Sequence, residues 1–470
     1  MKLVSQWVGI PVVVSFLLSY VVADLIPCNA TTSCPEKYPC CSQYGLCGTG
    51  GFCLGGCDVR YSYNLTACMP MPRMSSFNTV FDSKDGLVDQ SEYLGNSSEA
   101  DWAYSGSVDI NDGALLLQMP KNSGGSVISS TKYLWYGNVA ATLETSHLGG
   151  VVTAFILFSD IQDEIDYEFV GYNTTEIQTN FYHMGVTNYT NSRNYSVLDT
   201  FLNYHTYEID WTPEKIEWIV DGESKRTLLR ADTWNETSKT YMYPQTPSRI
   251  QMSLWPGGDK SNAPGTIEWA GGAIDWDAED IKKYGYYYAS LKNITIETYD
   301  KYIPKNITTK DGTGKPEDFH AFLYNSTKGG EGSVYLTQKK TWLGSLDASG
   351  FDPQNNKNKT QSSSSISKSG SSSTTNGNNN PTGVPKGSAG GNGDNNDNGN
   401  NGGNQADTTT IEYNTSGWVG GFVQNSKPTA SGPGESSSSP TKNEGISFAQ
   451  QTGIFGVICS VALGIVTFLI

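Results

Sequence analysis

The chain has little positive charge and little histidine. Its 470 residues carry 31 Lys and Arg against 47 Asp and Glu, which gives a net charge of −16. Without a basic patch to neutralise phosphates, the sequence excludes nucleic acid as a partner. The four histidines stand far apart, at positions 147, 183, 205 and 320. We therefore expect no metal centre, and because no phosphate-binding or dinucleotide-binding glycine motif occurs, we expect no cofactor.

Cysteine is missing from most of the chain. None stands between Cys68 and Cys459, whereas eight of the nine lie between Cys28 and Cys68. So short a segment cannot fold by apolar burial alone, and an even number of cysteines in a secreted chain is typical of a small disulfide-stapled module. Zinc binding is the alternative, but the adjacent pair Cys40-Cys41 and the absence of histidine from the segment disfavour it. We assign residues 24–70 to this module.

The two ends of the chain are apolar. Residues 1–23 have a positive start at Lys2 and an apolar core, and they end in a small residue, which is typical of a secretory signal. Residues 444–470 end in an apolar run with no Lys or Arg after it, which favours a GPI-attachment signal over a stop-transfer helix. Asn443 and Gly445 are both suitable attachment residues. We expect a secreted protein that is GPI-anchored at the cell surface or in the cell wall.

Residues 341–443 consist mainly of Ser, Asn, Gly and Thr and cannot bury a core, so they are predicted to form a flexible stalk. Residues 306–340 form a C-terminal extension before it. Many glycosylation sequons precede the stalk, which supports a glycosylated surface protein. Their asparagines are Asn29, Asn64, Asn96, Asn173, Asn188, Asn194, Asn235, Asn293, Asn306 and Asn325.

Long helical periodicity is almost absent from residues 71–305. Short apolar or alternating runs, among them 115–119, 137–145 and 205–211, predict strands, and Asp221-Gly222 predicts a hairpin turn. The fold class is therefore all-β, with a β-sandwich following the disulfide-rich module. Trp211 and Trp218 are expected in its core, while His205 is either structural or a hydrogen-bonding residue of a cleft.

The stretch 163–170 carries the chemistry. With a period of two, Glu164, Asp166 and Glu168 fall on one face of a strand, and Ile165, Tyr167 and Phe169 fall on the other. A row of three acids raises their pKa values and destabilises a strand, so it needs a function. Cleavage of a glycosidic bond uses two carboxyl groups, one charged and one protonated. A solvated acidic face is the plain alternative, and a calcium site lacks the glycine and loop spacing of an EF-hand.

The spacing of the acids leaves the stereochemistry open. Four residues of strand span about 13 Å, whereas retaining enzymes need carboxyl groups about 5–5.5 Å apart. Glu164 and Glu168 must therefore lean inward over Asp166 if the mechanism is retaining. An inverting mechanism leaves more room between the two carboxyl groups.

The cysteine-rich segment around Cys40-Cys41-Ser42-Gln43-Tyr44-Gly45-Leu46-Cys47 resembles the hevein-type chitin-binding module. The resemblance implies that Ser42, Tyr44 and Phe52 hold N-acetylglucosamine by hydrogen bonding and by stacking on the sugar faces. We expect an independent module. Its removal should weaken attachment to chitin without stopping chemistry on soluble oligosaccharides, and reduction should unfold it and spare the sandwich. The disulfides implied by the family are Cys28–Cys41, Cys34–Cys47, Cys40–Cys53 and Cys57–Cys68.

The acid motif, with Gln178–Tyr182 and Trp255-Pro256-Gly257-Gly258, resembles glycoside hydrolase family 16. The sequence that follows is similar to the fungal Crh-type cell-wall transglycosylases, in the motifs Asn262-Ala263-Pro264-Gly265-Thr266 and Gly271-Gly272-Ala273-Ile274-Asp275-Trp276. The cysteine-rich head and the anchor signal at the C-terminus are similar to those of the Utr subgroup. The resemblance covers roughly residues 24–300. It implies a jelly-roll β-sandwich and a retaining mechanism in which Glu164 is the nucleophile, Glu168 the acid/base and Asp166 the assisting carboxylate.

The same resemblance implies a function in the wall. A chitin donor would be cleaved and transferred to a β-glucan acceptor, which cross-links the two polymers. The alternatives are a chitin or β-glucan hydrolase, and a non-catalytic wall lectin or adhesin. Glu168, Gln251, Trp255 and Thr266 are expected to bind substrate, with Trp255 as an exposed platform on the acceptor side. We expect a monomer.

Overall fold

The structure is a computed structural model that describes residues 26–303, 318–351 and 353. The chain divides into a unit of residues 1–426 and a unit of residues 427–470, and all described residues belong to the first. The signal, most of the stalk and the anchor signal lie outside the described residues. No helix in the described part of the chain is long and apolar enough to span a membrane.

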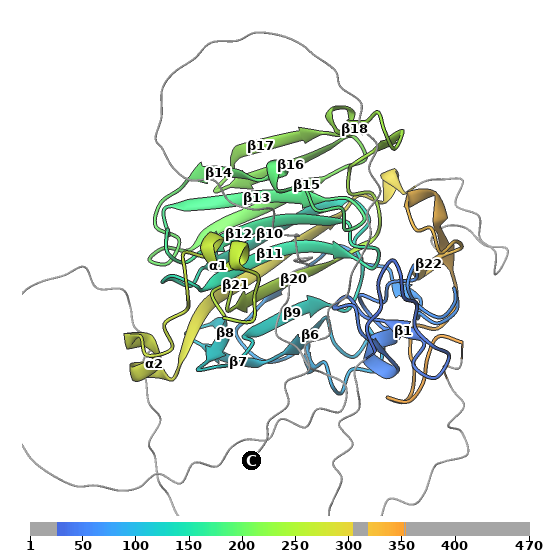
Figure 1. Ribbon diagram of the computed structural model, residues 1–470, viewed down its shortest axis with the longest axis horizontal. Coiled ribbons are helices and arrows are strands. Elements are labelled where there is room, and N and C mark those ends of the chain that lie inside the picture. Colours follow the sequence, from blue (N-terminus) through green and yellow to red (C-terminus); the bar gives the residue numbers. More distant parts are fainter. Residues whose placement is uncertain (1–25, 304–317, 352, 354–470) are drawn as a thin grey trace, which may run out of the picture. The chain divides into compact units, whose positions relative to one another are not determined.

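Two eight-stranded sheets make up the body of the molecule (Figure 1). We call the sheet that carries the acids the β12 sheet; its order is β14-β13-β12-β11-β20-β9-β6-β5, antiparallel except between β5 and β6. Its strands are β5 Leu87–Asp89, β6 Trp102–Ser105, β9 Ser126–Ser130, β11 Val152–Ser159, β12 Glu164–Val170, β13 Glu176–Tyr182, β14 Arg193–Ser196 and β20 Ser248–Trp255.

The second sheet, called the β10 sheet, has the order β17-β16-β15-β10-β21-β8-β7, and β4 also pairs with β21. Its strands are β4 Phe77–Val80, β7 Ser107–Asn111, β8 Ala114–Pro120, β10 Gly137–Glu144, β15 His205–Trp211, β16 Lys215–Val220, β17 Glu223–Leu229 and β21 Tyr286–Thr298. The fold is therefore all-β, as the sequence predicts, with the two antiparallel sheets of a jelly roll. The Asp221-Gly222 turn between β16 and β17 has positive φ at both residues, 51° and 79°, which is the geometry of a tight hairpin.

The core between the sheets is aromatic and aliphatic. Tyr167 on β12 is buried, its ring centroid lies 5.5 Å from that of Tyr207 on β15, and its hydroxyl donates to the carbonyls of Glu208 and Ile219. Ile165 and Phe169 are buried in the same cluster. The alternation predicted for residues 164–169 is therefore confirmed: one face of β12 anchors it in the core, and the other carries the acids.

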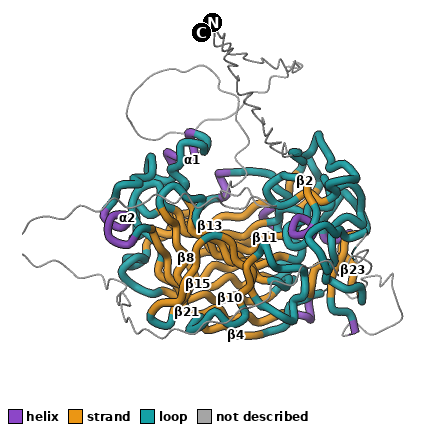
Figure 2. The backbone as a smooth tube through the Cα atoms, turned by 90° about the horizontal axis from the view of Figure 1, so that it is seen from below, coloured by secondary structure: helices purple, strands orange, loops and turns teal. Residues whose placement is uncertain are grey.

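Short elements lie at opposite ends of the strands. Helices α1 Pro264–Trp269 and α2 Glu279–Tyr284 lie at one end, and the cysteine-rich head lies at the other (Figures 1 and 2). The head contains β1 Cys40–Cys41 and β2 Cys47–Gly48. Two small sheets complete the described fold. They are formed by β18 Trp234–Asn235 with β19 Thr240–Tyr241, and by β3 Met71–Pro72, β22 Ala321–Tyr324 and β23 Val334–Thr337.

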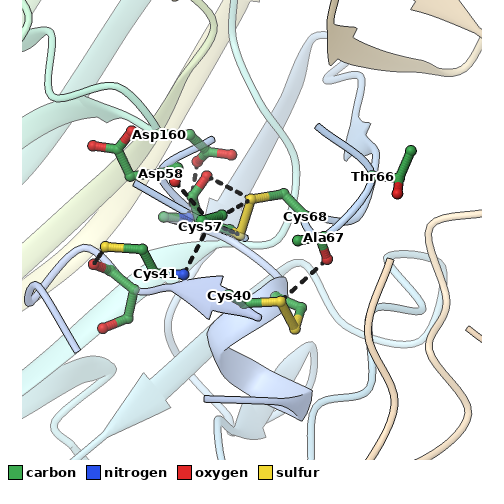
Figure 3. Close-up of a disulfide and its surroundings, with 12 residues drawn as sticks. Cys40, Cys41, Cys57, Asp58, Thr66, Ala67, Cys68 and Asp160 are labelled. Atoms are coloured by element: carbon green, nitrogen blue, oxygen red, sulfur yellow. Dashed lines mark hydrogen bonds between the residues drawn. A yellow bond between two sulfur atoms is a disulfide. The ribbon is translucent and has the colours of Figure 1, made fainter. Parts of the chain in front are cut away.

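The head is held by four disulfides, Cys28–Cys41, Cys34–Cys47, Cys40–Cys53 and Cys57–Cys68, the same pairs that the hevein-type resemblance implies. Figure 3 shows the Cys57–Cys68 bridge, with Asp160 of the sandwich close to Asp58 of the head. The Gly56 N–H donates to the Asp160 carboxylate at 2.8 Å. The last bridge of the head is thus next to its contact with the sandwich.

The head and the sandwich share one core. Cys40, Cys53 and Val59 belong to the same buried cluster as Tyr167 and the other residues between the two sheets. The head is therefore packed as part of the same body as the sandwich, because part of its apolar surface is buried against the sandwich and not within the head. That removal of the head spares chemistry on soluble oligosaccharides stays a prediction.

The C-terminal extension also packs on this body. β22 pairs with both β23 and β3, so residues 321–337 join the segment that follows the head. Leu343 is fully buried, and the Gly50 N–H of the head donates to the Ala348 carbonyl at 2.9 Å. Residues 341–351, which composition assigns to the stalk, are thus packed against the head.

Candidate active site

Glu164, Asp166 and Glu168 lie on one face of β12, which we call the acid face, and are 8 %, 0 % and 5 % exposed. Strands flank β12 on both sides, β11 through the Asp166–Ile156 pair and β13 through the Asp166–Asn180 pair. Residues paired across antiparallel strands project on the same side of a sheet. Each acid therefore stands in a row of side chains that runs across the sheet.

Asp166 is the most confined of the three acids. Both of its carboxyl oxygens are buried, and its charged neighbours are the carboxyl groups of Glu164 and Glu168. Burial raises the pKa of Asp166 well above its ordinary value, and the charges of Glu164 and Glu168 raise it further. The position of Asp166 therefore favours the neutral form of its carboxyl group.

On one side of the acids, β13 contributes three polar residues. Gln178, Asn180 and Tyr182 pair with Glu168, Asp166 and Glu164 respectively. The Asn180 amide donates to the Tyr182 hydroxyl at 2.7 Å. The pKa of Tyr182 is raised by burial first and then by the three acids, so its hydroxyl keeps its proton. We did not predict these three residues as part of the site, although their alternation in Gln178–Tyr182 places them on one face.

On the other side, β20 presents Arg249, Gln251 and Ser253 two strands away from β12. Gln251 pairs with Ile156 of β11, which pairs with Asp166, so Gln251 lies in the Asp166 row and on the same face as Trp255. Its side chain is 1 % exposed, and its amide donates to the Gln43 Oε1 of the head at 3.1 Å. Gln251 therefore faces the head.

The expectation of an exposed platform at Trp255 is wrong. Trp255 is on the acid face, in the row of Val152 and Val170, but it is 2 % exposed. Helix α1 covers it: the Trp269 ring stacks at 6.0 Å between centroids and 24° between planes. The Trp269 N–H donates at 2.8 Å to the Gln178 Oε1, next to Glu168, and Trp269 is only half-buried. Trp269, and not Trp255, is therefore the tryptophan that is partly exposed at this end of the acid face.

Thr266 also lies on helix α1, half-buried. Proline at the first position of this helix suits its start, because proline has no N–H to leave unpaired there. The acid face is therefore flanked by helix α1 at the Glu168 end and by the head near Arg249, opposite Glu164. Sequence alternation alone carries no signal for either contact.

All three residues proposed for the head's sugar site are half-buried. Burial raises the pKa of Tyr44 to about 12, and the charge of Arg249 acts against this rise. The Ser42 Oγ is buried and accepts or donates no hydrogen bond within the described residues. Phe52 is half-buried, with its ring against Gly48.

Several other polar or aromatic residues belong to the scaffold. Trp211 and Trp218 are fully buried, as expected, and the Trp218 N–H donates to the Asp166 carbonyl at 3.0 Å, which supports β12 from below. His205 Nδ1 contacts Asp221 of the β16–β17 turn at 2.6 Å, so this histidine is structural. Within the described residues, the one group close enough to hold a metal is Cys28, Cys34 and Cys47, whose sulfurs are in disulfides.

Comparison with known proteins shows the family of the chain. The family model "Glycosyl hydrolases family 16" matches residues 96–271. The chain is 56% identical over 454 residues to "Crh-like protein UTR2" of Candida albicans, covering 95% of each chain. It is 49% identical over 358 residues to "Congo red hypersensitive protein 2" of Saccharomyces cerevisiae, covering 75% of this chain and 74% of that protein. Among solved structures, "Apo Crh5 transglycosylase" is 27% identical with a TM-score of 0.46, covering 57% of this chain and 97% of the other.

Proposed function

This chain belongs to the Crh-like cell-wall transglycosylases of glycoside hydrolase family 16, and we propose that it cleaves chitin and transfers the released chain to β-glucan. The observation that carries the proposal is the acid face of β12, where three buried carboxyl groups stand in one row and burial raises the pKa of Asp166, the middle one. We further propose that the protein acts in the wall, held there by a GPI anchor at Asn443 or Gly445.

In the first step of the proposed reaction, Glu164 attacks the anomeric carbon of the donor sugar. Glu168 gives its proton to the glycosidic oxygen, that bond breaks, and the leaving chain departs with the proton. The product is an ester between Glu164 and the donor fragment. Asp166, which lies between the two glutamates on β12, is the assisting carboxyl group in this scheme.

In the second step, Glu168 is a base. It takes the proton of an acceptor hydroxyl, whose oxygen attacks the anomeric carbon and displaces Glu164. Two inversions give net retention. Water in place of the sugar hydroxyl would give hydrolysis, so the outcome depends on which acceptor reaches the ester.

The proposed retaining mechanism sets a requirement on the geometry of the row. Glu164 and Glu168 both raise the pKa of Asp166, the residue between them. About 13 Å of strand separates the two glutamates, whereas a covalent intermediate requires a short separation of their carboxyl groups. The proposal therefore requires the two side chains to lean toward each other over Asp166.

The transfer assay uses a secreted form ending at residue 443, which keeps every described contact. It is incubated with chitin oligosaccharides and a fluorescent β-glucan oligosaccharide, and the label is followed by size. We expect the label to move into larger products that chitinase shortens again. Glu164→Gln is the control, because it removes the nucleophile while keeping the shape of the buried side chain, and it should abolish turnover with an unchanged unfolding temperature.

Three results would contradict the proposal. Shortened donor with unchanged label would indicate a hydrolase, and no change in either sugar would indicate a wall lectin. Turnover retained in Glu164→Gln would remove this residue from the nucleophile's role.

A further inference from the structure

The head contacts the acid face through one side chain. Gln43 Oε1 accepts hydrogen bonds from Arg249 Nη2 at 2.5 Å and from Gln251 Nε2 at 3.1 Å. Both donors are on β20, and Gln251 lies in the Asp166 row. Two strand spacings, about 10 Å, separate this row position from Asp166. The head therefore contacts the face of the sheet that carries the acids, two strands away from them.

The backbone of the head is shaped for this contact. Gly55 has no Cβ, and one placed there would lie 2.4 Å from Arg249 Nη1, so only glycine leaves room for the guanidinium. The next residue, Gly56, donates its N–H to the Asp160 carboxylate at 2.8 Å. Arg60 of the head donates to the Met184 carbonyl, at the end of β13, at 2.9 Å. Three separate segments of the sandwich thus fix the head's position.

The sugar-binding residue expected in the head lies at this border. Tyr44 is next to Gln43, which hydrogen-bonds its hydroxyl, and the charge of Arg249 acts on it. The ring that the hevein-type resemblance assigns to sugar stacking therefore lies at the contact between the head and β20, on the face of the sheet that also carries the acids.

We propose that the head is one wall of the substrate site, with Gln43 as the residue that fixes it against β20. A single sugar chain extending from β12 toward β20 is then held by the sandwich and by the head together. This inference rests on the proposed function and adds a specificity: the head selects for chain length. Short oligosaccharides that end before β20 do not reach Gln43.

The test compares Gln43→Ala with Gln43→Glu in the full chain. Alanine removes both hydrogen bonds to β20, whereas a carboxylate of the same size still accepts them and pairs with Arg249. KM and kcat are measured against donors of increasing length with a fixed acceptor, and against acceptors of increasing length with a fixed donor. Glu36→Ala, an exposed change in the same head, is the matched control.

We expect Gln43→Ala to raise KM about 3- to 10-fold for the long oligosaccharides of either the donor series or the acceptor series. This is the loss of affinity expected when one or two hydrogen bonds are removed. KM for the shortest substrates and kcat should not change, and Gln43→Glu should restore the wild-type length preference. A merely structural role would lower the active fraction, and so the rate, equally at all lengths.

If Gln43→Ala changes KM equally at every substrate length, or does not change it, the inference about the head is overturned. Transfer by the wild-type protein in the same assay would still support the proposed function. The comparison is repeated without turnover by measuring oligosaccharide binding in the Glu164→Gln protein, with and without Gln43→Ala. There the inference requires a loss of affinity for long oligosaccharides alone. This arm decides the role of the head even if the wild-type protein shows no transfer.

Discussion

The buried carboxylate of Asp160 gives a prediction with a definite sign. Asp160 accepts hydrogen bonds from the Tyr133 hydroxyl at 2.5 Å and from the Gly56 N–H at 2.8 Å, between the sandwich and the head. Burial raises its pKa from 3.8 to about 6. Its folded pKa is thus above its unfolded pKa, so the native state binds more protons between pH 4 and pH 6. Native stability therefore falls as the pH rises through this range.

The magnitude follows from the shift. Two pKa units correspond to about 3 kcal/mol of unfolding free energy. Asp160→Asn keeps an oxygen that accepts both hydrogen bonds but carries no charge at any pH. We expect the stability of the variant, relative to wild type, to rise by about 3 kcal/mol from pH 4 to pH 7, which is several degrees in melting temperature.

The assay is thermal or urea unfolding of both proteins across this pH range. All other titrating groups are common to the two proteins and largely cancel in the difference. Asp85→Asn, at an exposed position, reports the effect of a lost charge away from the head. A difference between Asp160→Asn and wild type that is constant from pH 4 to pH 7, or that shrinks, would refute the reasoning.

Two further predictions concern the two flanks of the acid face. Trp269→Phe keeps a ring over Trp255 but removes the N–H that donates to the buried Gln178, so KM for transfer should rise about tenfold. Trp269→Ala should raise KM at least as much. Unchanged steady-state kinetics in both variants would contradict this prediction. Reduction of the disulfides should lower the unfolding temperature of the sandwich together with the head, because their core is shared; a sandwich transition by calorimetry that is insensitive to reductant would contradict it.

The parts of the fold that follow from local patterns could be predicted. Alternation placed Glu164, Asp166 and Glu168 on one face and Tyr167 in the core, because side-chain direction in a strand depends only on parity. The hairpin at Asp221-Gly222 follows from the two residues themselves, which tolerate positive φ. The acid site is readable from sequence for the same reason, since its three acids lie on one strand.

Contacts between distant segments could not be predicted. Gln43 and Gln251 are 208 residues apart, and neither has a neighbouring pattern that identifies the other. Trp255 shows the same limit: alternation gives its face, but its burial depends on Trp269 from a helix of six residues. Exposure is a property of what covers a side chain, and local sequence does not encode it.

The strip of chain at the end of the described fold determines how the protein bears mechanical load. Its Gly350 N–H donates to the Ala67 carbonyl at 2.7 Å, and a Cβ on Gly350 would lie 2.4 Å from the Thr66 and Cys68 carbonyls. A pull on the chain from residue 353 onward therefore acts first on these noncovalent contacts between the strip and the head, and then on β23 and β22, which precede the strip in the chain. The strand that carries the acids belongs to a different sheet and lies outside this path.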